Sequence, residues 1–192
     1  NGGGTGLSKD QIALTLAICA DSKYDVRKDG SKYVHFEFIK ERKILRLRGI
    51  LERLGITYTS YFSTRASGKV YTTFNFKMPS YITDKQIPKS WVANATLSEK
   101  DFILEELRWW DGNVSKDIVE FNSKHYSECS TIQELCVTSG RYSRIRKRSN
   151  ELGTWYVCSV HDKELTGSTA RASKVTKSFT GKVYCVTVPT GM

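Results

Sequence analysis

The stretch from Ile12 to Ala20 is apolar at every position except Thr15. A helix with this sequence has no polar face, so it is expected to be buried on all sides. Ser8 stands before it as a candidate N-cap, and Gln11, three residues later, completes a capping-box pattern. The pattern predicts a buried helix that begins just after Ser8.

A second segment repeats this arrangement. Ser98 is a second candidate cap, Asp101 follows three residues later, and another largely apolar helix is predicted after it. The first segment ends at Asp21 before a serine, and the second ends at Asp111 before a glycine. The two serines are 90 residues apart, and so are the two aspartates. The equal spacing indicates an internal duplication.

The segments after each aspartate also correspond in outline. In the first copy, period-two alternation predicts strands at 33–38, 56–64 and 69–78, and a helix at 41–54 that ends at Gly55. That helix places its apolar residues on one side: Ile44, Leu45, Leu47, Ile50, Leu51 and Leu54. In the second copy, strands are predicted at 117–121, 141–149 and 154–161, and a helix at 131–138 that ends at Gly140.

The chain therefore reads as an α+β protein of two αββαββ-like repeats, each too small to bury a good core alone. We place the first repeat at 8–92 and the second at 93–165. The glycine-rich residues 1–7 read as a flexible linker. Residues 166–192 form a separate C-terminal segment. Parallel packing of the two opening helices brings both aspartates to the same end.

The charge balance favours a polyanionic partner. Thirty Lys and Arg against twenty Asp and Glu give a net charge of +10 and a pI near 9.4. Basic side chains that neutralise phosphates release counterions, which favours nucleic-acid binding. A merely solvated basic surface is the alternative that composition leaves open.

The cysteines indicate neither a disulfide framework nor a zinc site. Their number is odd and no two form a C-x-x-C pair: Cys19, Cys129, Cys136, Cys158 and Cys185. We therefore expect a reducing, cytoplasmic environment. No apolar run reaches membrane-spanning length, so no membrane partner is expected.

The two helix ends resemble the paired motifs of the LAGLIDADG homing endonucleases. Ala20-Asp21-Ser22 is similar to the end of the first motif and Trp110-Asp111-Gly112 to the end of the second. Lys85-Gln86-Ile87-Pro88 resembles a K-x-I-P segment of intein-borne members, and residues 182–189 (KVYCVTVP) resemble a strand of the intein splicing domain. Residues 7–165 resemble the endonuclease, which implies two antiparallel sheets forming a saddle on DNA around paired central helices.

Three positions depart from the family pattern. Leu16 and Glu106 stand where glycine is usual in the two motifs, and Trp110 stands where a small residue is usual. The contact between the two helices is therefore expected to differ from that of other members.

Paired carboxylates can hold divalent cations that activate water and stabilise charge at phosphorus. Our hypothesis is that Asp21 and Asp111 bind Mg²⁺ (or Mn²⁺), each serving one DNA strand. The resemblance implies the backbone carbonyls of Ala20 and Trp110 as further ligands. The alternative for each aspartate is a helix-end residue that bonds local amides.

Two lysines are candidates for a position near the scissile phosphate. Lys85 matches the family lysine of the K-x-I-P segment, and Lys163 is its proposed counterpart in the second repeat. A cation there could polarise the attacking water or stabilise charge. The alternative for Lys85 is an ordinary surface lysine before a proline turn.

The candidate DNA-reading residues alternate along strands, so they share one face. In the second repeat they are Arg144, Arg146 and Arg148, with Ile145 facing the other way. In the first repeat they are Thr59, Tyr61 and Arg65, with Tyr33 and His35 on the neighbouring strand. Arginine can contact guanine edges and phosphates, although charged strands also prevent aggregation.

The residues and the resemblance together predict a Mg²⁺-dependent, site-specific endonuclease for double-stranded DNA, and the resemblance implies that it is the endonuclease domain of an intein. The two halves carry different side chains, which predicts a long asymmetric target read by a monomer. One alternative is a LAGLIDADG-fold protein that binds nucleic acid without cutting, as an intron maturase does. The other is a generic basic nucleic-acid-binding domain, which would make the 90-residue spacing a coincidence.

Overall fold

The computed structural model describes residues 2–110, 112–115, 118–151, 153–164 and 180–181. The first repeat contains α1 (Lys9–Asp21), β1 (Lys23–Val26), β2 (Lys32–Phe38), α2 (Glu41–Arg53), β3 (Thr59–Thr64) and β4 (Val70–Lys77). A short helix α3 (Ser90–Asn94) follows. The second repeat contains α4 (Leu97–Glu106), the 3₁₀ helix η1 (Leu107–Trp109), β5 (Asn113–Ser115), β6 (Ile118–Ser123), α5 (Tyr126–Thr138), β7 (Arg141–Asn150) and β8 (Gly153–Glu164).

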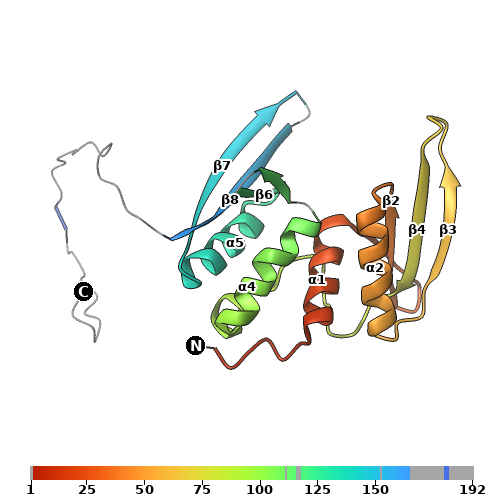
Figure 1. Ribbon diagram of the computed structural model, residues 1–192, viewed down its shortest axis with the longest axis horizontal. Helices are drawn as coiled ribbons and strands as arrows, with labels where there is room; N and C mark the ends of the chain where they lie inside the picture. Colours follow the sequence, from red (N-terminus) through yellow and green to blue (C-terminus); the bar gives the residue numbers. More distant parts are fainter. Residues whose placement is uncertain (1, 111, 116–117, 152, 165–179, 182–192) are drawn as a thin grey trace.

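Each repeat forms one antiparallel sheet of four strands. The strand orders are β1-β2-β4-β3 and β5-β6-β8-β7, so the two sheets have the same topology. Central pairs such as Phe36 with Phe74 and Phe121 with Cys158 point into the core. Figure 1 shows the sheets on opposite sides of the helices, with α1 and α4 between them. The α+β fold and the duplicated αββαββ order are thus confirmed.

Helix α1 is buried over seven consecutive residues, Ile12 to Ile18. It packs against α2 on one side and α4 on the other, which is how a helix without a polar face is covered. Its first turn has the expected capping box, because Ser8 accepts from the Gln11 amide and the Gln11 side chain accepts from the Ser8 amide at 2.8 Å.

The start of α4 differs from the prediction. Its capping box is formed by Thr96 and Glu99 and not by Ser98 and Asp101. Ser98 lies inside the helix and is exposed. The capped residues of the two helices are therefore 88 residues apart, because Thr96 competes successfully for the cap. Past Glu106, α4 tightens into the 3₁₀ turn η1.

The sequence also failed to predict some elements, one helix start and the position of one apolar residue. Strand β1 and helix α3 were not predicted, and α5 begins at Tyr126, five residues before the expected start. Leu45 was placed on the apolar side of α2, yet it is 56% exposed. At about 100° per residue it points away from Leu47, and Lys43 takes the place on the buried stripe.

The N-terminal residues are held in place. The Gly4 amide donates to the Asn94 carbonyl at 2.8 Å, and the Thr5 hydroxyl donates to Glu99 at 2.7 Å. Burial alone would raise the pKa of Glu99, but hydrogen bonds from Thr5 and Thr96 lower this pKa to about 2. These hydrogen bonds connect residues 4 and 5, within the segment expected to be a linker, to the second repeat.

The described cysteines are free thiols. Burial raises the pKa of Cys129 and Cys136 to about 11, so both remain protonated near neutral pH. Cys185 and the strand-like segment 182–189 lie outside the described residues. Within the described ranges, no helix has the length and apolarity needed to cross a bilayer.

The small residues after the two motifs have different constraints. Ser22 is buried and its hydroxyl donates to the Ile18 carbonyl at 2.7 Å. At Gly112 a Cβ atom would lie 2.8 Å from the Leu107 carbonyl oxygen and 2.9 Å from the Arg108 Cα. The second motif therefore requires glycine where the first accepts serine.

We expect Gly112→Ala to destabilise the protein by about 1–3 kcal/mol, because the added methyl group meets backbone that cannot move away cheaply. Gly3→Ala is the matched control, since nothing lies within 4 Å of a Cβ there. Urea unfolding of both variants measures the difference. Equal stabilities would contradict the close approach at Gly112.

Candidate functional site

Asp21 ends α1 and is ion-paired with Lys43 of α2. The distance from Lys43 Nζ to Asp21 Oδ2 is 2.5 Å, and the two side chains are 10% and 20% exposed. Lys43 was not among the predicted site residues. The signal for it was present, because Lys43 lies four residues before Leu47 on a stripe that is otherwise apolar. A lysine on such a stripe needs a partner.

Contacts through β2 and α2 connect the ends of the two motifs. Lys43 Nζ lies 5.8 Å from the centre of the Phe38 ring, and that ring stacks on Trp110 at 6.2 Å. Asp21 and Trp110 therefore lie on either side of the same pair of residues, Lys43 and Phe38. Asp111 itself lies outside the described residues. Its neighbour Trp110 nevertheless shows that the second motif ends beside the first repeat.

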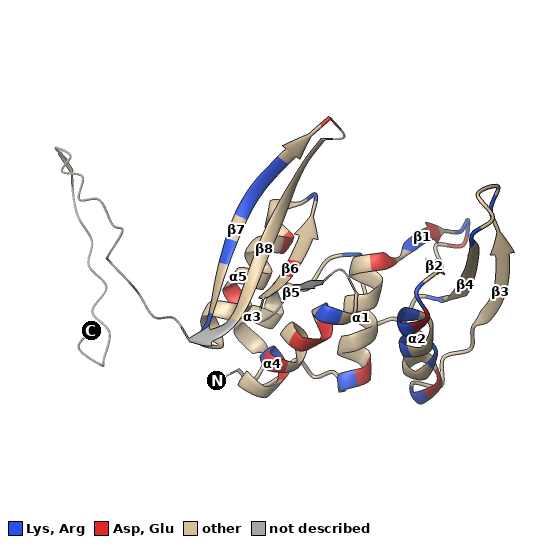
Figure 2. Ribbon diagram, turned by 45° about the horizontal axis from the view of Figure 1, so that its top comes forward, with Lys and Arg blue, Asp and Glu red and all other residues tan. Residues whose placement is uncertain are grey.

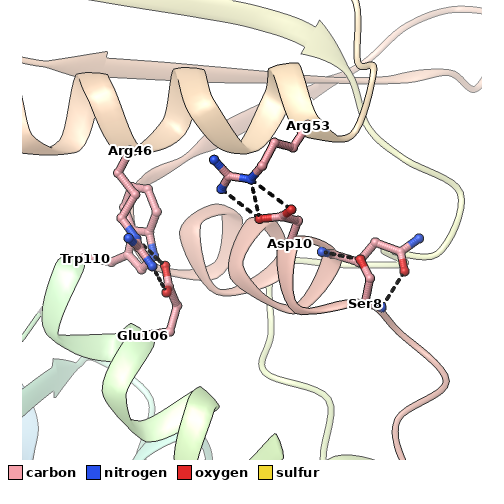
Figure 3. Close-up of polar contacts among 7 residues, drawn as sticks. Ser8, Asp10, Arg46, Arg53, Glu106 and Trp110 are labelled. Carbon is pink, nitrogen blue, oxygen red and sulfur yellow. Dashed lines mark hydrogen bonds and ion pairs between the residues drawn. The ribbon is translucent and has the colours of Figure 1, made fainter.

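Glu106 and Trp110, the two residues at which the second motif departs from the expected pattern, are hydrogen-bonded to each other (Figure 3). Glu106 is 1% exposed, and its Oε1 accepts from the Trp110 indole at 3.0 Å. The same carboxylate accepts from Arg46 of α2, through Nε at 2.7 Å and through Nη2. Glu106 thus supplies the acceptor that a buried indole requires, and Arg46 supplies the charge that a buried carboxylate requires.

The exposed face of the first sheet carries the predicted residues of that repeat. His35 opposes Asn75, which opposes Thr59, and Tyr61 opposes Thr73, so these side chains share one face. A hollow of about 350 Å³ on this face is lined by Asp21, Lys23, Asp25, His35, Glu37, Tyr61 and Thr73. Asp21 therefore opens onto the surface where DNA contacts were predicted.

Polar contacts order this first face. His35 lies 2.9 Å from Asp25 and also bonds Asn75, while Arg65 donates to Glu37 at 2.7 Å. The Arg27 guanidinium covers the ring of Tyr33 at 3.5 Å. The face mixes acids, hydroxyls and amides with a few cations.

The exposed face of the second sheet is more basic. Arg144, Arg146 and Arg148 oppose Ser159, Val157 and Trp155 of β8 on one face, whereas Ile145 opposes the buried Cys158 on the other. Figure 2 shows the resulting run of basic residues along β7. Arg148 lies 3.9 Å from Glu120 of β6. The two faces thus differ in chemistry, as the sequence predicted.

The remaining predicted residues are less well placed. Lys85 is half-buried in the bend between β4 and α3, and the cation found at Asp21 is Lys43. Lys163 lies within β8, where only its backbone is described. Ala20, in the last turn of α1, is half-buried.

The donor set is compatible with Mg²⁺. No group of three or more His, Cys, Asp or Glu side chains among the described residues forms a closed metal cage. Magnesium does not need one, because it binds through one or two carboxylates together with water and substrate phosphates. Asp21, an oxygen ligand at the edge of an open hollow, meets that requirement.

A comparison with models of known protein families found no match. The chain is 27% identical over 200 residues to the ribonucleoside-diphosphate reductase subunit beta of Aquifex aeolicus. The match takes in 97% of this chain but only 28% of the reductase protein.

Solved structures define the fold. A mesophilic variant of the homing endonuclease I-DmoI superposes with a TM-score of 0.58 at 11% identity, over 80% of this chain and 89% of that one. The N-terminal LAGLIDADG domain of DUF199/WhiA gives 0.58 at 12% identity, over 82% and 78%. Other I-DmoI structures are complexes with DNA and contain or were determined in the presence of Mn, Mg or Ca. The chain has the LAGLIDADG fold, which both an endonuclease and the WhiA domain share.

We expect the Lys43–Asp21 pair to be strongly coupled. In a double-mutant cycle of Lys43→Met and Asp21→Asn, the coupling should be about 1–3 kcal/mol, because the pair is largely buried. The more exposed pair Arg53–Asp10 is the control and should give roughly 0.2–1 kcal/mol. Urea unfolding measures both cycles. A Lys43–Asp21 coupling no larger than the control would contradict the buried pairing.

Proposed function

We propose that this chain is a Mg²⁺-dependent, site-specific endonuclease for double-stranded DNA that acts as a monomer. The observation that carries the proposal is the meeting of the two motif ends at Lys43 and Phe38, between two sheets with differently charged faces. Two repeats within one chain supply both halves of such a site, so no second copy is required.

The residues at the two motif ends have distinct parts in this proposal. Asp21 and Asp111, with the carbonyls of Ala20 and Trp110, would hold the cations. Bound Mg²⁺ would supply water activation and charge stabilisation at phosphorus. Lys43 fixes the Asp21 carboxylate and brings a positive charge to the site, where it can stabilise a phosphate. Lys43 is thus a further candidate, beside Lys85, for the cation near the scissile phosphate.

The likeness to part of a reductase supports an inserted element. A LAGLIDADG fold has no evident part in reducing ribonucleotides, yet a similar segment occupies 28% of the Aquifex protein. An intein, which places a nuclease domain inside an unrelated host protein, would produce this pattern. We therefore infer that the chain comes from an intein and that its target lies in an uninterrupted host gene.

The second candidate function is nucleic-acid binding without cleavage. The likeness to the LAGLIDADG domain of WhiA supports it, because this domain matches the chain with the same TM-score as the endonuclease I-DmoI. The departures at Glu106 and Trp110 also favour it. Incubation with Mg²⁺ and DNA separates the two functions, since only the endonuclease gives cut product.

We expect Asp21→Asn to abolish cutting while DNA binding persists. The first substrate to test is an uninterrupted gene for ribonucleoside-diphosphate reductase subunit beta, followed by a library of target sequences. The cleavage rate should fall by about 100-fold or more, the scale of losing one group that stabilises the transition state. Asp29→Asn is the matched control, because Asp29 is exposed and its carboxylate accepts hydrogen bonds from Ser31. Binding by wild type without any cutting would favour the second candidate.

We expect Arg146 to contribute to DNA affinity and its neighbour Lys147 to contribute little. Both are exposed cations on β7, but they point to opposite faces. Arg146→Ser should weaken binding to a target duplex by about tenfold, because an arginine contact with a base contributes roughly 1–3 kcal/mol. Lys147→Ser removes the same charge from the other face. Fluorescence anisotropy at fixed salt measures both, and equal losses would rule out a specific contact by Arg146.

A further inference from the structure

The last turn of the second motif is held by the first repeat. Arg46 binds Glu106 and also covers the ring of Trp109, with its guanidinium 4.4 Å from the ring centre. Arg42 donates to the Arg108 carbonyl at 3.5 Å. The side chain of Trp110 stacks on Phe38. All of these contacts run from the β2–α2 segment of one repeat to residues 106–110 of the other.

The side chain of Trp110 is fixed in two ways. Its indole N–H donates to Glu106, and its ring packs against Phe38, which leaves Trp110 2% exposed. The backbone leaves helical geometry at this residue, with φ −100° and ψ −93°. The last described residue of the second motif is therefore tied, through its side chain, to Glu106 and to the first repeat.

We propose that Glu106 is a positioning residue: by joining Arg46 to the Trp110 indole, it sets the end of the second motif against the first repeat. The proposal rests on the proposed function in one respect, which is that the Trp110 carbonyl and Asp111 are taken as cation ligands. In this proposal Glu106 is not a cation ligand. It acts through Trp110.

The choice of a charged residue here argues for positioning. Leu16 occupies the corresponding place five residues before the first aspartate, and it is fully buried without any charge. A buried ion pair contributes little stability compared with apolar residues of similar size. Hydrogen bonds between Glu106 and Arg46 are directional, unlike apolar contacts. The planar guanidinium and the indole N–H together define the orientation of the Glu106 carboxylate.

The test compares Glu106→Gln with Asp10→Asn. Asp10 also binds an arginine of α2, since Arg53 donates to it at 2.8 Å (Figure 3), but this pair stays within the first repeat. Each substitution removes the negative charge that pairs with an arginine of α2. Only Glu106→Gln removes a charge that links the two repeats.

The first readout is amide hydrogen exchange measured by NMR. The Trp110 and Gly112 amides both donate to the Leu107 carbonyl, at 3.3 and 3.1 Å. Exchange at these two amides should become about tenfold faster in Glu106→Gln and stay unchanged in Asp10→Asn. Unchanged exchange in Glu106→Gln would overturn the proposal, whatever the protein binds.

The second readout is Mn²⁺ binding followed by electron paramagnetic resonance. Loss of a group that orients a ligand typically weakens metal binding by about 10- to 100-fold, so Glu106→Gln should lose affinity and Asp10→Asn should not. A lower melting temperature with unchanged exchange and Mn²⁺ affinity would assign Glu106 a purely structural role. A wild type that binds no Mn²⁺ and cuts no DNA would contradict the proposed function, and hydrogen exchange would still decide the role of Glu106.

Glu106 is so deeply buried that the variant could fail to fold, so Arg46→Met provides a second route. The Arg46 side chain is 26% exposed. Its substitution removes the same link between the repeats, but from the side of the first repeat. Arg46→Met should reproduce the faster exchange at Trp110 and Gly112. Protection equal to that of wild type would contradict the proposal.

Discussion

Helix α1 has no polar face, and the fold follows from the need to cover it. Seven consecutive buried residues cannot be covered by one sheet and one helix, so α2 packs on one side and α4 of the second repeat on the other. Neither repeat has a complete core alone. The packing of α1 against α4 therefore joins the two repeats in one shared core, and it is the constraint that brings the two motif ends together.

Polar contacts then set the details of that junction. Lys43 pairs with Asp21 at the end of the first motif, and Arg46 pairs with Glu106 in the second. Both cations come from α2, three residues apart. One helix of the first repeat thus controls the surroundings of both motif ends, which makes the site asymmetric even though the fold is duplicated. The two sheet faces add to this asymmetry, because the arginines of β7 have no counterpart in the hydroxyl-rich β3.

Much of the fold could be predicted from periodicity. The alternation in β2 and β7 and the apolar run of α1 identified elements whose faces the structure confirmed. Helix starts were harder, since Thr96 and Ser98 are both good caps and only the partner at Glu99 decides between them. Leu45 was assigned to the apolar side of α2 together with its apolar neighbours. Its own angular position on the helix points it away from that side.

The candidate site was only partly predictable. Asp21 was identified because its spacing repeats, and the arginines of β7 because they alternate. Lys43 and Arg46 were missed, since their partners lie 22 and 60 residues away and a charge on a helix is usually solvated. Glu106 and Trp110 were recognised only as departures from a pattern. That they bond to each other depends on a side-chain geometry that spacing does not specify.

The central claim is that the two motif ends share one cation-filled centre. Mn²⁺ broadens the NMR signals of nearby amides, so a titration that follows Ser22 and Gly112 in the complex with DNA tests this claim directly. Our account predicts that both signals broaden together at the same Mn²⁺ concentration. Broadening of only one signal, or of neither, would contradict it.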